Sequence, residues 1–413
     1  MTEFAFFGIQ GYYGFMNKEK INDLLAFSLG MINGENGKEL IEKYKKAIET
    51  ITPHEMIALE EEQLRMGIPP ARIKKTIGKV INSFYKSLSS YDWGKPEDKG
   101  FLYYLMEENR ELEKRLREIK SVLKEFNPEE EAFPDNLKRK LTPLFVDLLK
   151  FDAHYVKKEN ILFPYLEKFW DNYRPLKVMW SLHDDIRKSL KEILNLLQDR
   201  WSSWEDLNRE IGNYFFLTYG MIFKEELIIF PVAWETVEQK YWDDMHVKSF
   251  EFSFPFIETP ERPEIIVKHD NWDLGSVFVT DTGTLNFEQL EALFGSLPMD
   301  ITVVDENDRV AYFTHSKDRI FPRSSAIIGR LVQNCHPPES VHVVEEIIET
   351  FRKGEKDKAV FWINAKGKKL LIQYFAMRNK KGEYKGVLET TQDITEIQSL
   401  EGEKRLLNWR DND

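Results

Sequence analysis

Cysteine is almost absent from this sequence, because Cys335 is the one cysteine among 413 residues. This scarcity excludes an internal disulfide framework and a cysteine-rich metal site. Basic residues are outnumbered, and the formal net charge of -12 argues against a general nucleic-acid binder, since phosphate binding needs a dense basic surface. Long apolar runs are also missing, and no stretch approaches the roughly 18 unbroken apolar residues expected of a membrane span.

The motifs of several large enzyme classes are missing as well. The sequence contains no phosphate-binding P-loop, no protein-kinase signature set, no nucleophile elbow and no paired cysteine motif. Its first residues lack the basic start and apolar core of a secretory signal. We therefore expect a cytoplasmic protein that contacts no membrane and is not an enzyme.

Three regions with different hydrophobic periods follow one another along the chain. The first contains short helical patterns, and "TPHE" predicts a helix start with Thr52 as N-cap, Pro53 in the first turn and Glu55 reaching back. Four longer helical patterns follow and predict an antiparallel four-helix bundle, and the last region has short strand patterns around one helix. The predicted divisions are an all-α module (1–92), the bundle (93–249), a Pro-rich linker (250–285), an α+β domain (286–405) and a tail (406–413).

Within the bundle, one short pattern occurs twice. "HYVKKENILFP" at 154–164 and "MIFKEELIIFP" at 221–231 carry Lys, Glu, Ile, Phe and Pro at matching places. The first copy begins with His154 and the second with Met221. The repeat indicates either two halves of a metal site or two copies of a packing motif of which one lacks its ligand.

The three regions resemble known families. The bundle resembles the hemerythrin-like HHE cation-binding domain through "HYVKKENILFP", "SLHDDIR" and "KEELIIFP". Residues from about 290 to 400 resemble a PAS sensor domain through "GRLVQNCHPPESVHVVEEIIETF" and "TTQDIT". The first module resembles a helical domain of unknown function that commonly precedes these two, through "ITPHEMIALEEEQLRMGIPPARIKK".

The hemerythrin resemblance implies a set of metal ligands. His154 and Glu159 lie five residues apart, about 140° around an ideal helix, a spacing that also occurs in hemerythrins. The pattern departs from the family at Met221, where a His is expected, and near the start of the first helix, where Tyr103 offers a phenolate instead. The candidate ligands are His154, Glu159, His183, Glu226 and Tyr103.

This reduced set leaves two interpretations open. It could hold iron, as a mononuclear or dinuclear centre, or manganese or zinc with an open coordination position. It could equally form a buried hydrogen-bonded cluster without metal, because carboxylates against imidazoles are electrically tolerable.

The PAS resemblance implies a domain for dimerisation or ligand sensing, and most domains of this fold carry no cofactor. Three residues are candidates for a bound cofactor. His336 or His342 could ligate a haem, and Cys335 could act as a thiolate ligand or redox sensor. His336 stands before two prolines, which favours a structural role in a turn, and Cys335 also fits a small buried position.

Taken together, these features predict a cytoplasmic sensor or regulatory protein. Its bundle would respond to metal, O2, NO or redox state, and its PAS domain would form a homodimer and pass the signal to a protein partner. The alternatives are a non-haem iron oxidase or peroxidase, a metal-free interaction scaffold, and haem sensing through the PAS domain.

Overall fold

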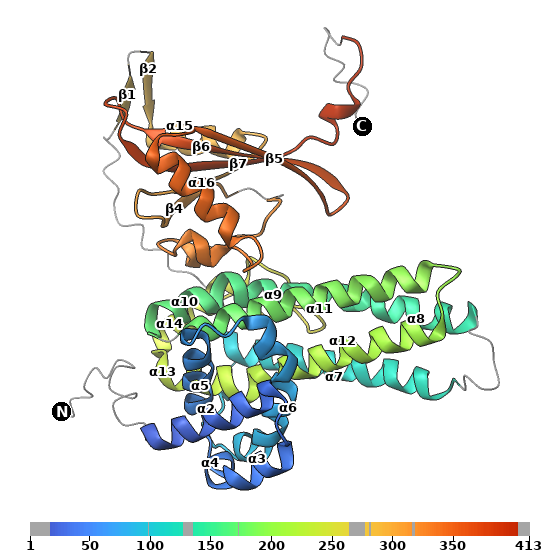
Figure 1. The fold of residues 1–413 in the computed structure, drawn as a ribbon. Coiled ribbons are helices and arrows are strands. Elements are labelled where there is room, and N and C mark those ends of the chain that lie inside the picture. The colour runs from blue at the N-terminus through green and yellow to red at the C-terminus, as the bar shows by residue number, and fades with distance from the viewer. Residues whose placement is uncertain are drawn as a thin grey trace. The chain divides into compact units, whose positions relative to one another are not determined.

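The structure is a computed structural model, and Figure 1 shows its fold. It describes residues 17–97, 99–126, 135–171, 173–263, 277–280, 282–315 and 319–403. The chain divides near residue 265 into two compact units. Residues 264–276 and 281 of the predicted linker, and all of the predicted tail at 406–413, lie outside the described residues.

The first unit begins with short helices, as predicted. Thr52 caps one of them through the predicted reciprocal bonds with Glu55: the Glu55 amide donates to the Thr52 hydroxyl, and the Thr52 amide donates to the Glu55 carboxylate. The helices of this module are α2 (Lys18–Asn33), α3 (Gly37–Lys43), α4 (Lys45–Glu49), α5 (Pro53–Arg65) and α6 (Pro70–Ser89).

The predicted four-helix bundle follows in the same unit. Its second and fourth arms are broken into segments by a short 3-10 turn or a π-helical turn, whereas the first and third arms are continuous. The arms are α7 (Phe101–Lys124), then α8 (Asp135–Leu148), α9 (Asp152–Lys157) and α10 (Phe163–Phe169), then α11 (Arg174–Gln198), then α12 (Trp204–Lys224) and α13 (Phe230–Thr236). A further helix, α14 (Gln239–Ser249), closes the unit.

The N-terminal module and the bundle share one continuous hydrophobic core. Polar contacts also join them. His54 on α5 lies 2.6 Å from Glu235 on α13, measured from Nε2 to Oε2, and the ammonium of Lys224 on α12 donates to Glu60 on α5. The helices from Lys18 to Ser89 therefore pack with the bundle in one compact unit.

The predicted linker also begins inside the first unit. After α14 the chain folds back, and Phe254 is buried among residues of the bundle. Phe256 stacks on Phe151, with ring centroids 5.8 Å apart, and the guanidinium of Arg115 lies 3.8 Å from its centroid. Phe256 has a φ of 67°, a left-handed conformation that a bulky residue adopts only where its surroundings hold it.

The second unit has the predicted α+β order. A hairpin of β1 (Val277–Thr280) and β2 (Gly283–Asn286) leads into α15 (Phe287–Ser296). A five-stranded antiparallel sheet follows, in the order β4-β3-β7-β6-β5. Its strands are β3 (Asp300–Val304), β4 (Val310–Phe313), β5 (Lys358–Ala365), β6 (Lys368–Arg378) and β7 (Tyr384–Asp393).

One helix, α16 (Val341–Lys353), packs against this sheet (Figure 1). Val344, Ile348 and Phe351 of this helix are buried against the strands. Gly386 in β7 allows the sheet to close, because a Cβ on this residue would stand only 2.0 Å from the carbonyl oxygen of Val304 in β3.

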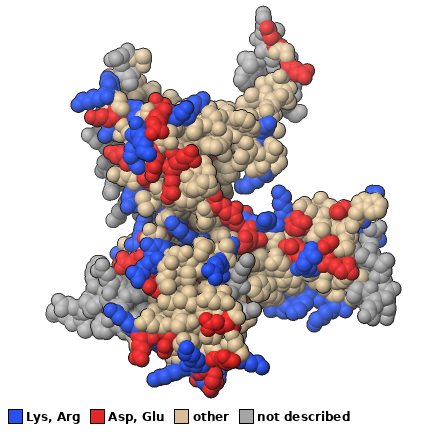
Figure 2. Space-filling view, in the orientation of Figure 1, with Lys and Arg blue, Asp and Glu red and all other residues tan. Residues whose placement is uncertain are grey.

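The surface mixes charges of both signs, and acidic and basic side chains alternate over the face shown in Figure 2. Within the described residues, no helix is both long enough and apolar enough to cross a membrane. Other charged side chains, among them Lys158 and Glu225, are buried inside the bundle.

Candidate functional site

A buried imidazole lies at the centre of the bundle. The Nδ1 atom of His154 on α9 is 2.8 Å from Oε2 of Glu108 on α7, and its Nε2 atom is 3.2 Å from Oε2 of Glu225, which follows α12. All three side chains are fully buried. Both ring nitrogens of His154 are therefore engaged by carboxyl groups.

Two lysine ammonium groups complete this arrangement. Lys157 donates to Oε1 of Glu108, and Lys158 donates to Oε1 of Glu225. Both lysines are buried, with Lys158 at 0% exposure. Each carboxyl group thus contacts the imidazole with one oxygen and an ammonium with the other, so the five side chains form a continuous hydrogen-bonded network.

A second histidine lies beside this network. The Nδ1 atom of His183 on α11 is 2.8 Å from Oε1 of Glu159, and the guanidinium of Arg187 donates two hydrogen bonds to the Glu159 carboxylate, at 2.9 and 3.1 Å. The Nε2 atom of His183 is buried and has no hydrogen-bond partner among the described residues.

Four buried carboxylates of this unit each have a cation of their own. Glu60 on α5 pairs with Lys224 on α12, whose ammonium lies 2.6 and 2.8 Å from the two carboxylate oxygens. The other three pairs are Glu108 with Lys157, Glu225 with Lys158 and Glu159 with Arg187. Pairing of this kind is needed because an isolated charge in a protein interior is strongly unfavourable.

Aromatic rings cover the two imidazoles. Phe151 stacks on His154 and Tyr155 stacks on His183, each with centroids 4.6 Å apart. The Lys158 ammonium lies 4.8 Å from the Tyr155 ring centroid, and the Lys157 ammonium lies 4.3 Å from that of Phe254. These contacts keep water away from the charges and place ring faces over the cations.

Burial controls the protonation of the cluster. It lowers the pKa of His154 and of His183 well below the usual value, so both rings are neutral, and it raises the pKa of Glu108 to about 7. A neutral imidazole has a single N–H. One of the two contacts of His154 therefore needs a proton from a carboxyl group, and Glu108 with its raised pKa can supply it to Nδ1.

The repeated sequence builds two matching π-helical turns. These turns, Lys158–Leu162 and Glu225–Ile229, each end in Phe-Pro. In the first, the amide of Phe163 donates to the carbonyl of Lys158, five residues back, and in the second the amide of Phe230 donates to Glu225. The proline that follows each Phe cannot donate and crowds the carbonyl four residues before it, which favours the wider turn.

The comparisons with known proteins agree with this architecture. Residues 100–233 match the family "Hemerythrin HHE cation binding domain", and residues 290–395 match the family "PAS domain". The chain contains a hemerythrin HHE domain followed by a PAS domain. Comparison with curated proteins gave no match.

Among solved structures, a C-terminal domain from Streptococcus mutans is 31% identical over 31% of this chain and 100% of that chain, with a TM-score of 0.30. A PAS domain from Colwellia psychrerythraea is 19% identical over 26% of this chain and 97% of its own, with a TM-score of 0.21. A sensory box sensor histidine kinase from Vibrio cholerae is 15% identical over 26% of this chain and 90% of its own, with a TM-score of 0.21.

A resident metal does not fit the donor set of this HHE domain. The carboxylates that would bridge or ligate a metal already hold ammonium groups, and both nitrogens of His154 face carboxyl oxygens. Within the described ranges, no group of three or more His, Cys, Asp or Glu residues is placed to hold a metal ion. Nε2 of His183 is the one imidazole nitrogen of the cluster without a partner in this part of the chain.

The structure brings three of the five predicted ligands together. His154, Glu159 and His183 all lie in or beside the cluster. Glu226 does not, because Glu225 occupies the inner position, and Glu226 accepts a 3.3 Å hydrogen bond from Asn109. Tyr103 lies on α7 five residues before Glu108, and its ring packs edge-on against Tyr104.

Several members of the cluster were missed by the sequence argument. Glu108 and Asn109 come from "MEEN" on α7, and the Asn109 amide donates to Glu225 at 2.8 Å. Lys157 and Lys158 lie within the first copy of the repeat, between His154 and Glu159. Two adjacent lysines on the inner side of a proposed metal-binding helix were the signal that could have identified the ion pairs.

The three candidates in the PAS domain do not form one cluster. Nδ1 of His336 lies 2.9 Å from the carbonyl oxygen of Val332, an arrangement that orders the turn before α16, and burial lowers the pKa of this ring. The Cys335 thiol is buried, with its sulfur 3.7 Å from the carbonyl oxygen of Leu331. His342 is exposed on the first turn of α16.

Proposed function

We propose that this chain is a sensor or regulatory protein without catalytic activity of its own. In this proposal the PAS domain receives the signal, and the HHE domain transmits it to a protein partner as a helical scaffold. The combination of these two domains supports a signalling role. The burial of the cluster supports a non-enzymatic one, because His154, Glu108 and Glu225 are fully enclosed and each already contacts a partner inside the bundle.

The proposal rests on the contacts that the start of the linker makes with the bundle. The segment that leads from the bundle toward the PAS domain places Phe254 over the Lys157 ammonium and stacks Phe256 on Phe151, which in turn stacks on His154. A change in the tension or position of this segment would therefore act directly on the buried cluster. Phe256 also has a positive φ of 67°, a conformation that costs energy in a bulky residue, so release of this segment would relieve backbone strain.

Hydrogen exchange of the full-length chain tests this route. Phe256→Gly removes the ring but tolerates the positive φ, so it breaks the stacking without adding backbone strain. We expect exchange to become about tenfold faster in residues 151–158 and also to change in the PAS strands. The control is Trp201→Ala, which alters a side chain that is 92% exposed. If the faster exchange is confined to 250–263, the route does not exist.

The reverse experiment starts in the PAS domain. Phe351 lies in the core between α16 and the sheet, and Phe351→Ala loosens this core. Transmission through the linker predicts faster exchange around Phe254 and Phe256 as well. An effect that stops at the PAS domain would show that the two domains are not coupled.

We also propose that the PAS domain pairs with a second copy of itself. The edge strand β5 exposes the apolar run Val360–Ile363, in which Trp362 is 66% exposed, and α15 has no buried residue. Exposed apolar edges of this kind favour association. Trp362→Lys is expected to convert a dimer to a monomer in sedimentation experiments, whereas a wild-type chain that is already monomeric at micromolar concentration would contradict the proposal.

A further inference from the structure

We infer that Lys157 and Lys158 are built-in cations that take the place of a metal in this hemerythrin-like bundle. The bundle then keeps the carboxylates and imidazoles of a metal-binding core but neutralises them with its own side chains. This inference goes beyond the proposed function and is independent of the linker route.

The pairing of atoms supports this assignment. Glu108 and Glu225 each use one oxygen for an ammonium group and the other for His154, so no carboxylate oxygen of the two remains for a metal. Each of the two carboxyl groups thus faces one lysine of its own. A divalent ion added to this arrangement would be repelled by both lysines and would have to displace them from a fully buried position.

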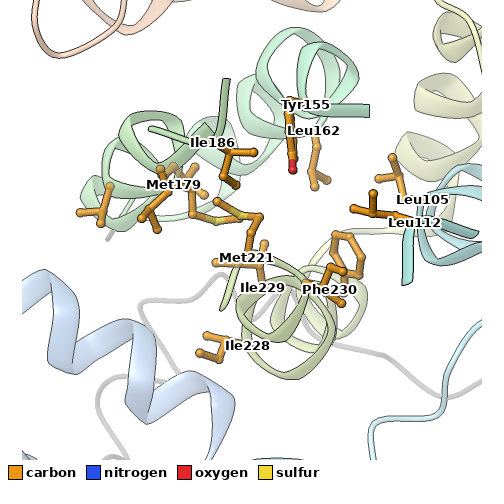
Figure 3. Close-up of a cluster of buried hydrophobic side chains, with 14 of the residues drawn as sticks. Leu105, Leu112, Tyr155, Leu162, Met179, Ile186, Met221, Ile228, Ile229 and Phe230 are labelled. Carbon is orange, nitrogen blue, oxygen red and sulfur yellow. The ribbon is translucent and has the colours of Figure 1, made fainter. Parts of the chain in front are cut away.

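The residue at position 221 supports the same conclusion. Met221 stands where the family pattern places a histidine, and it is packed among apolar side chains that include Ile186 and Ile229 (Figure 3). This position is therefore filled by apolar packing, and the lysines supply the positive charge that a metal would otherwise supply. Both changes stabilise the bundle without metal.

Removal of the two ammonium groups should convert the cluster into a metal site. We would replace both lysines in the full-length chain, as Lys157→Met and Lys158→Met, because Met is similar in length and carries no charge. This variant retains Glu108, Glu225, Glu159, His154 and His183. We expect it to bind Co(II) at least about 100-fold more tightly than the wild-type chain, by calorimetry and by visible absorption of the bound ion.

Lys224→Met is the matched control. It removes a lysine that is equally buried and equally paired, but its partner Glu60 has no imidazole contact in the described structure. We expect this variant to be destabilised and still not to bind Co(II). Added Co(II) should raise the melting temperature of the double variant only.

Two results would overturn the inference. One is a wild-type chain that retains about one equivalent of iron, manganese or zinc after purification, or that binds Co(II) as tightly as the double variant. The other is a folded double variant that binds no better than the wild-type chain. If the double variant does not fold, Lys158→Gln gives the same test at one position, because its amide can still donate to Glu225.

Discussion

The two copies of the repeated sequence have the same backbone and opposite charge at one position. Lys158 in the first copy corresponds to Glu225 in the second, and these two residues form an ion pair with each other at the centre of the bundle. Both begin a π-helical turn that ends in Phe-Pro. The repeat therefore sets the path of the chain, whereas a single exchange of Lys for Glu sets the contact between the copies.

The neighbouring positions differ in a similar way. Lys157 and Lys224 are identical in type, yet the first pairs with Glu108 inside the bundle and the second pairs with Glu60 of the N-terminal module. Equal residues in equal local structures thus have different partners. The comparison shows that the surrounding helices, and not the repeat, determine what each lysine neutralises.

The largest expected effect comes from breaking the central pair. Lys158→Met leaves the Glu225 carboxylate buried without its cation, and we expect it to lower the free energy of unfolding by about 4 kcal/mol. Urea unfolding followed by circular dichroism measures this loss. Adding Glu225→Gln should recover most of it, since both charges are then absent. A double variant that loses the sum of the two single-variant losses would show that the pair is not coupled.

A smaller effect concerns the pH dependence of stability. The lowered pKa values of His154 and His183 make the folded state lose stability as the pH falls below about 6.5. The raised pKa of Glu108, about 7, acts in the opposite direction, because its contribution is present at low pH and is lost as the pH rises through 7. Between pH 5 and 7 the two effects oppose each other.

Glu108→Gln removes the opposing contribution. We expect this variant to lose about 2 kcal/mol more than the wild-type chain when the pH is lowered from 7 to 5. Urea unfolding at pH 5, 6 and 7 provides the comparison, and the slope is informative even though the variant is less stable at every pH. A slope that does not change would mean that Glu108 titrates normally.

The smallest expected effect distinguishes the two adjacent glutamates of the second copy. Glu226 accepts one hydrogen bond from Asn109 and is only partly buried, so Glu226→Gln should cost about 0.5 kcal/mol. Glu225→Gln alone leaves Lys158 without a counter-charge and should cost several times more. Similar losses in urea unfolding for the two variants would contradict the inward placement of Glu225.

The fold was predictable from sequence because each region has a distinct period. The four-helix bundle, the capping box at Thr52 and the α+β order of the last region all follow from local patterns, and the structure confirms them. The sharing of one core between the N-terminal module and the bundle was not predictable. It depends on contacts such as Lys224 with Glu60, 164 residues apart, which no local pattern reveals.

The site was predictable only where the residue type is diagnostic. His154 and His183 stand out because histidine is scarce in this chain, and the structure places both of them in the buried cluster. The family pattern pointed to Glu226, whereas the structure places the adjacent Glu225 at the inner position. The π-helical turn changes the rotation per residue, so the helical phase calculated for a regular α-helix does not hold there.

The pairing of Lys224 with Glu60 has a practical consequence for how the protein can be divided. A fragment that begins at Trp93 would contain a complete four-helix bundle by sequence, but it would lack the carboxylate that neutralises Lys224 and the imidazole that contacts Glu235. Such a fragment would carry an unbalanced positive charge in what had been its interior. The smallest autonomous unit of this protein therefore includes the first helices, and a shorter piece should be unstable or insoluble when produced alone.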